Sequence, residues 1–111
     1  MSQQPNDQIV VLMTAPNAGE ATRIAEMLVE RKLAACVQIL PPMTSIYVWK
    51  GEVQRESEIL LIAKSTGAKF DELESAVRAI HSYETPEIIA LPIVAGSPSY
   101  LSWLLSCLEG S

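Results

Sequence analysis

The stretch from Leu33 to Ser65 is the longest strand-like segment of the chain, and it constrains the fold more than any other. Its first arm, residues 33–49, is interrupted by Pro41-Pro42, and its second arm is residues 53–64. Lys50-Gly51-Glu52 separates the arms, and its glycine supplies the positive φ that a tight turn needs. Because proline cannot donate a ladder hydrogen bond, the first arm must bend at a sheet edge. The sequence therefore predicts one long, bent β-hairpin.

Side chains near the tip of this hairpin alternate between the two faces of the strand. Tyr47 and Trp49 share one face with Ser45, whereas Ile46 and Val48 share the other. Apolar groups on both sides of such a long hairpin are an aggregation hazard unless another chain covers them. The tip therefore predicts self-association, with Tyr47 and Trp49 as interface residues.

The composition of the 111 residues supports the same expectation. Apolar residues make up 49% and charged residues 19%, against a usual charged share of about 25%. One domain of this size, expected over residues 8–109, buries only about two-thirds of its unfolded surface, so the excess predicts an oligomer. The alternative is a monomer with an apolar surface.

Charge and segment lengths exclude several partners. A net charge of −5 without a basic stripe predicts no nucleic-acid partner. No apolar run approaches membrane-spanning length, so no membrane partner is expected. Residues 1–7 are polar and unlike a targeting peptide, which predicts a flexible tail. The two cysteines, Cys36 and Cys107, are too few for a disulfide scaffold, and the chain is expected in the cytoplasm.

The other elements follow from periodicity. The continuous apolar run at 8–14 predicts a central strand buried on both faces. Asn17, followed three residues later by Glu20, resembles a capping box. The helix that it opens has apolar positions 21, 24, 25, 28 and 29, and Glu20 lies outside this apolar face. Arg31 and Lys32 are expected in its last turn. A second helix over 68–80, an edge strand over 88–94 and a helix over 100–108, capped by Ser97 and ended by Gly110, complete the chain.

This order, β α β β α β with an additional C-terminal helix, predicts an α+β protein of the ferredoxin-like class. Its antiparallel sheet carries helices on one face, and the second and third strands form the long hairpin. The other face is bare, which is a second reason to expect self-association. The fold class alone does not choose a function.

The loop at residues 81–87 carries the candidate chemistry. His81 stands with Glu84 and Glu87 at i, i+3 and i+6, and Tyr83 lies between them. Imidazole and carboxylates suit a divalent ion or acid–base work. The alternative is that His81 caps the C-terminal end of the second helix. No nucleophile is paired with a base, which predicts that the protein is not an enzyme.

The cysteines and the other aromatic residues each have two interpretations. Cys36, in a strand of small and apolar residues, is core filler or a reactive thiol. Cys107 is expected in the core or an interface. Tyr47, Trp49, Tyr100 and Trp103 form either a ligand-stacking wall or an interface, and interface anchoring is the commoner use.

Four motifs resemble the CutA divalent-cation tolerance family in order and spacing: Leu33-Ala34-Ala35-Cys36-Val37, Tyr47-Val48-Trp49-Lys50-Gly51-Glu52, Thr85-Pro86-Glu87-Ile88 and Tyr100-Leu101-Ser102-Trp103-Leu104. The resemblance covers residues 9–108. It implies a homotrimer similar to the PII signalling proteins, with hairpins pairing between neighbours and sites in clefts between subunits. It also implies a link to copper and other divalent cations, with no required cofactor.

The resemblance leaves two functions open. The first is a homotrimeric binding protein for Cu²⁺ or a similar ion, with His81, Glu84, Glu87 and Cys36 as candidate ligands. Of the thiol positions proposed in relatives only Cys36 is matched, since Met13 and Ala76 occupy the others, and Ser82 stands where proline is usual. The alternative is a PII-like regulator that binds an anionic metabolite or a protein in the same cleft, through Lys50, Arg55 and Lys64.

Overall fold

The structure, a computed structural model, describes residues 7–109. They form strands β1 (Gln8–Ala15), β2 (Cys36–Ile39), β3 (Met43–Trp49), β4 (Glu52–Thr66) and β5 (Ile88–Pro92), helices α1 (Ala18–Glu30), α2 (Phe70–Ile80) and α3 (Pro98–Cys107), and a 3-10 turn η1 (Gly67–Lys69) that opens α2. The predicted tail lies outside the described residues apart from Asp7, and so does Gly110. No helix within 7–109 is both long and apolar enough to span a membrane.

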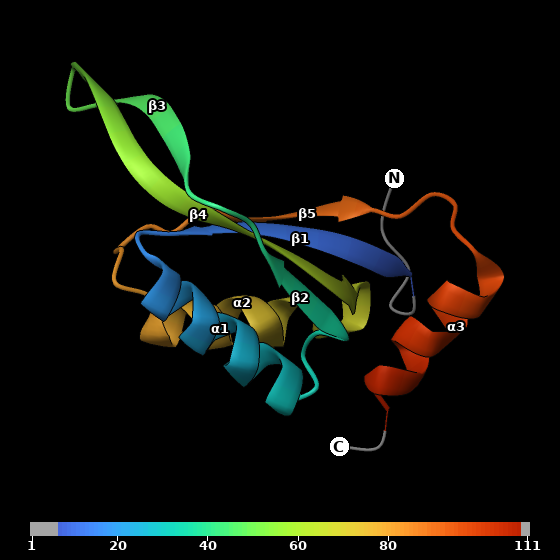
Figure 1. Cartoon of the computed structure of the whole chain (residues 1–111). Coiled ribbons are helices and arrows are strands. Elements are labelled where there is room, and N and C mark those ends of the chain that lie inside the picture. Colours follow the sequence, from blue (N-terminus) through green and yellow to red (C-terminus); the bar gives the residue numbers. More distant parts are fainter. Residues whose placement is uncertain (1–6, 110–111) are drawn as a thin grey trace.

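The strands form an antiparallel sheet in the order β2-β4-β1-β5, and β3 pairs with the other end of β4. Figure 1 shows α1 and α2 side by side against one face of this sheet, while α3 lies at its end. The predicted ferredoxin-like βαββαβ order with a C-terminal helix is confirmed. The bent first arm of the hairpin is β2 and β3 together, separated at residues 40–42.

Alternation along the strands places the core on one face of the sheet. Ile9, Val11 and Met13 of β1 are at most 1% exposed and pack with α1 and α2. The side chains on the opposite face are partly exposed in this chain: Val10, Leu12, Leu60, Ile62, Ile89 and Leu91. The prediction that β1 is buried on both faces is therefore wrong for the chain described, because the helices cover only one face. We call these six residues the bare face.

The hairpin projects beyond the sheet (Figure 1). It ends in a two-residue turn between Trp49 and Glu52. Lys50 and Gly51 have φ values of 52° and 82°, the positive pair that a type I′ turn requires, and Trp49 pairs with Glu52. Ile46, Val48 and Trp49 are exposed by 62%, 66% and 58%. The tip thus has apolar groups on both faces, as predicted.

Helix α1 begins where the capping pattern indicates, but one residue of that pattern is used differently. The Oδ1 atom of Asn17 accepts a hydrogen bond from the backbone N–H of Glu20 at 2.9 Å. Glu20 was predicted to lie outside the apolar face of the helix, yet the residue is only 4% exposed because its side chain turns inward to the 81–82 segment. Arg31 and Lys32 follow the helix instead of forming its last turn, since α1 ends at Glu30.

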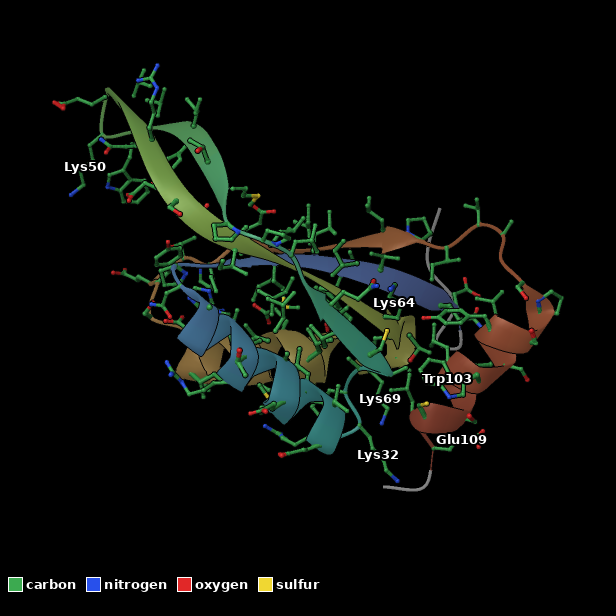
Figure 2. The ribbon with its side chains drawn as sticks, viewed as in Figure 1. Lys32, Lys50, Lys64, Lys69, Trp103 and Glu109 are labelled. Atoms are coloured by element: carbon green, nitrogen blue, oxygen red, sulfur yellow. The ribbon has the colours of Figure 1, made fainter. Side chains whose placement is uncertain are left out.

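The C-terminal helix closes a small second cluster against the sheet. Leu104 and Leu108 pack with Ala35, and the ammonium of Lys32 donates to the backbone oxygen of Glu109 at 3.1 Å. Ser97 is the N-cap residue, but its side chain makes no capping bond. Figure 2 shows Trp103 on α3, at the opposite end of the molecule from Lys50 at the hairpin tip.

Candidate functional site

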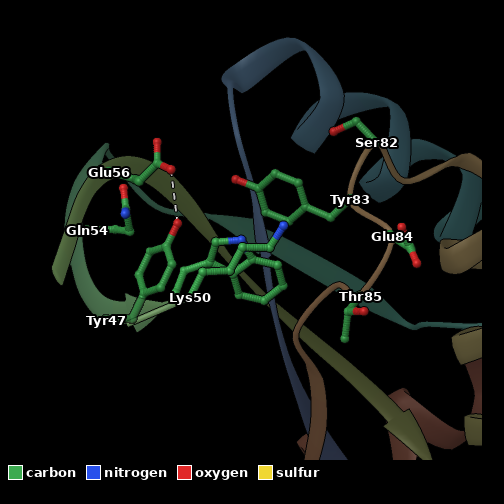
Figure 3. Close-up of a pocket in the computed structure, with 9 residues that line it drawn as sticks. Tyr47, Lys50, Gln54, Glu56, Ser82, Tyr83, Glu84 and Thr85 are labelled. Atoms are coloured by element: carbon green, nitrogen blue, oxygen red, sulfur yellow. Dashed lines mark hydrogen bonds between the residues drawn. The ribbon is translucent and has the colours of Figure 1, made fainter. Parts of the chain in front are cut away.

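A cleft of about 720 Å³ separates the hairpin from the loop that follows α2 (Figure 3). Two segments line it: Tyr47, Trp49, Lys50, Gln54 and Glu56 from the hairpin, and Ser82, Tyr83, Glu84 and Thr85 from the loop. The hairpin residues are brought to one wall by strand alternation, because Tyr47 pairs directly with Gln54 and Trp49 with Glu52.

The hairpin wall combines aromatic rings with a carboxylate. The phenol of Tyr47 donates a hydrogen bond to Oε1 of Glu56 at 2.9 Å. This bond raises the pKa of the Tyr47 phenol, because the neighbouring carboxylate favours the protonated form. Because Glu56, Tyr47 and Trp49 all line the cleft, this wall offers negative charge beside two aromatic side chains.

The loop wall is centred on Tyr83, which points from the loop toward the hairpin in Figure 3. Its phenol donates to Oε2 of Glu58 at 3.0 Å, and Glu58 is itself 8% exposed. Burial and then this hydrogen bond raise the pKa of Tyr83 to about 12. Glu84 lies on the other side of the loop, exposed at the rim of the cleft.

The imidazole of His81 is buried beneath this loop, with a side-chain exposure of 0%. Its Nε2 atom lies 2.8 Å from the backbone oxygen of Thr14, and its Nδ1 atom lies 3.0 Å from the backbone nitrogen of Tyr83. An amide N–H can only donate, so we assign Nδ1 as acceptor and Nε2 as the protonated nitrogen. His81 is the C-cap residue of α2, but its ring is turned to β1.

Glu20 holds the same segment from the other side. Its Oε2 atom accepts from the backbone nitrogen of Ser82 at 2.9 Å and from the Ser82 hydroxyl at 3.1 Å, and it lies 3.3 Å from Nδ1 of His81. Burial alone would raise the pKa of Glu20, but the two hydrogen bonds from Ser82 outweigh this effect and the pKa is lowered. Glu20 is therefore an ionised carboxylate at neutral pH, and its Oε2 atom holds the Ser82 backbone and hydroxyl.

The predicted metal ligands are not gathered within this chain. Glu84 and Glu87 are exposed, whereas both ring nitrogens of His81 already have partners. Across residues 7–109, no three His, Cys, Asp or Glu side chains are placed to hold a metal ion. A metal at His81 would have to displace one of its present contacts. The ligand role of His81, Glu84 and Glu87 stays a prediction.

Cys36 lies elsewhere, on the same side of the sheet as the bare face, because it pairs with Lys64, which pairs with Val10. Its sulfur is 3.6 Å from the Tyr100 hydroxyl and 3.9 Å from the Lys64 ammonium. The contact with Cys36 raises the pKa of Tyr100. Met13 is buried on the opposite face, so these positions do not form one cluster.

The aromatic residues predicted at an interface are exposed in the chain. Tyr47 is 40% and Trp103 46% exposed, and the rings of Trp103 and Tyr100 contact each other at a tilt of 39°, with centroids 5.5 Å apart. Sequence reasoning missed Glu20 and Glu58 as site residues. Glu20 had a local signal in the capping pattern, but its partner Ser82 is 62 positions away along the chain.

The sheet order, the helices on one face and the cleft under a long hairpin define a ferredoxin-like α+β protein with a ligand-sized site beside its hairpin. The chain belongs to the CutA1 divalent ion tolerance protein family, whose model matches residues 9–107.

Individual relatives agree with this assignment. The divalent-cation tolerance protein CutA of Thermus thermophilus is 52% identical over 95 residues, which are 86% of this chain and 92% of that protein. The CutA protein of Pectobacterium atrosepticum is 39% identical over 98% of this chain and 100% of its own. The solved structure of CutA1 from Oryza sativa has a TM-score of 0.91 and 44% identity, covering 95% of this chain and 96% of that one. The chain spans 61% of a Xenopus laevis CutA homologue and 56% of the mouse protein.

Proposed function

We propose that this protein is a homotrimer that binds divalent cations in the cleft beside the hairpin and serves in tolerance of such ions. The observation that carries the proposal is the pair of exposed carboxylates, Glu56 and Glu84, on two separate segments that border one open cleft. Carboxylate oxygens are ligands for divalent cations. Two carboxylates are too few for a tight site, so we infer that a neighbouring subunit completes it.

Exposed apolar surface supports the assembly. The bare face presents Ile89 and Leu91 at 49% and 50% exposure, next to Val10 and Leu12. The hairpin tip adds Trp49 at 58%. Monomers rarely expose apolar patches of more than a few hundred Å². Association through these surfaces would bring a second chain to the cleft, and we take the number of subunits, three, from the family resemblance.

Cu²⁺ is the ion to test first. It is highest in affinity among the first-row divalent ions, and nitrogen and oxygen donors suit it, whereas Mg²⁺ demands an octahedral oxygen set and keeps most of its waters. We propose that the protein binds the ion and does not catalyse a reaction. His81 is not placed as a general base in this proposal, because its Nε2 atom contacts the backbone carbonyl of Thr14 and not a nucleophile. The free thiols of Cys36 and Cys107 support a reducing compartment such as the cytoplasm.

The test is a calorimetric titration of Cu²⁺ into the parent and four variants. Glu56→Gln combined with Glu84→Gln should weaken binding at least tenfold, since two charge-bearing ligands are lost. Glu26→Gln, an exposed carboxylate on α1, is the matched control and should bind as the parent does. His81→Ala and Cys36→Ser report on the ligand roles predicted for those residues. Unchanged binding in the double variant would refute the cleft as the cation site.

A PII-like regulator that binds an anion in the same cleft is the second candidate, and one observation favours it. Lys50 lines the cleft, although Arg55 alternates to the other face of β4 and Lys64 lies near the far end of that strand (Figure 2). Lys50→Ala separates the two candidates. It should strengthen Cu²⁺ binding by removing a like charge, whereas an anion site would lose the one cationic side chain that lines the cleft among residues 7–109.

A further inference from the structure

We propose that Glu20 and His81 form a buried latch that positions the Ser82–Thr85 loop as one wall of the cleft, so that both residues set cation affinity without contacting the cation. This inference rests on the proposed function of the cleft. It gives His81 a positioning role in place of the ligand role that its spacing suggests.

The latch ties together three segments that are distant in sequence. Glu20 belongs to the first turn of α1, Thr14 to the end of β1, and His81 and Ser82 to the segment after α2. Glu20 accepts two hydrogen bonds from Ser82 and lies beside His81, whose ring bridges Thr14 and Tyr83. The carboxylate and the imidazole are 6% and 0% exposed as side chains.

The loop makes few other hydrogen bonds that would hold it in place. Among the described residues, the side-chain hydrogen bonds recorded for 82–85 go to Glu20, His81 and Glu58. The loop is otherwise outside the sheet and the helices, and Ser82, Glu84 and Thr85 are exposed. Exposed loops with few buried contacts open most easily, so the latch determines how long this one stays in place.

Tyr83 connects the latch to the cleft, because it contacts His81 and also lines the cleft. The Tyr83 ring contacts the His81 ring at a tilt of 47°, with centroids 4.9 Å apart, and the backbone nitrogen of Tyr83 donates to that same imidazole. Its hydroxyl then reaches Glu58 on β4. A shift of His81 therefore moves Tyr83, and with it the rim that carries Glu84. A buried donor or acceptor that loses its hydrogen-bond partner costs free energy, so Glu20 and His81 are held in one arrangement.

The experiment measures amide hydrogen exchange and Cu²⁺ affinity on the same full-length proteins. Glu20→Ala should speed exchange of the Ser82 and Tyr83 amides about tenfold or more and weaken Cu²⁺ binding about tenfold, because their acceptors are lost or released. Glu26→Ala, an exposed glutamate on the same helix, should change neither quantity.

The conservative variants separate a latch from a ligand. His81→Gln keeps a side-chain donor and acceptor but lacks the imidazole that a transition metal prefers. We expect His81→Gln and Glu20→Gln to recover most of the affinity that His81→Ala and Glu20→Ala lose. This comparison also serves if an alanine variant fails to fold.

Three results would overturn the inference. Exchange at Ser82 and Tyr83 could remain as in the parent when Glu20 is replaced, or exchange could quicken with no loss of affinity. His81→Gln could also lose as much affinity as His81→Ala while Glu20→Ala binds normally, which would make His81 a ligand. If the parent binds no Cu²⁺, the proposed function fails, and the exchange rates alone decide whether the latch exists.

Discussion

Replacing Trp49 at the hairpin tip should weaken the assembly by an amount that the structure allows us to work out. The residue is 58% exposed in the single chain. If a neighbour covers that fraction of a side chain that buries roughly 200 Å² when enclosed, about 120 Å² of apolar surface leaves water. At about 25 cal/mol per Å², Trp49→Ala then costs about 3 kcal/mol of assembly free energy per subunit.

Sedimentation equilibrium over a range of concentrations measures this loss directly. Val29→Ala is the control, because Val29 is 44% exposed on α1, away from the hairpin and the bare face. We expect the Trp49 variant to dissociate at concentrations where the parent and the control stay assembled. Equal dissociation curves for all three proteins would show that the tip anchors nothing.

Three further predictions concern single side chains. Leu61→Ala, at a fully buried core position, should lower the free energy of unfolding by about 2–5 kcal/mol in denaturant titrations, and a smaller loss would mean a loosely packed core. Glu20 has a folded-state pKa lowered from 4.5, so its charge stabilises the protein above that pH and the benefit is lost as the pH falls through the folded value. The stability gap between the parent and Glu20→Gln should therefore shrink in acid, and a constant gap would contradict the assignment. Tyr83 has a pKa raised from 10.0 to about 12, so the parent should lose stability as the pH rises between these values, and Tyr83→Phe should lack that part of the alkaline fall.

The parts of the fold that local chemistry decides could be predicted from the sequence. The Lys50-Gly51 turn needs positive φ at its centre, and the Asn17 cap needs only a helix amide three residues away. The bend at Pro41-Pro42 follows from a missing N–H group. Each of these signals lies within a few residues of the structure that it specifies.

The site was harder to predict because its contacts join distant segments. Tyr83 meets Glu58 across 25 positions, and His81 meets the Thr14 carbonyl across 67. Spacing within the loop grouped His81 with Glu84 and Glu87. The His81 ring is buried, however, and both of its nitrogens contact backbone atoms inside the protein. The sequence predicted which loop borders the site, but only the tertiary structure shows the direction in which each side chain points.

The central claim is that divalent cations bind a cleft that is complete only in a homotrimer. Native mass spectrometry of the parent with Cu²⁺ tests both halves in one spectrum. The account predicts a species with three chains and bound copper, and no copper on any single chain that dissociates. A monomeric protein, or a trimer that stays free of copper while single chains carry it, would contradict the account.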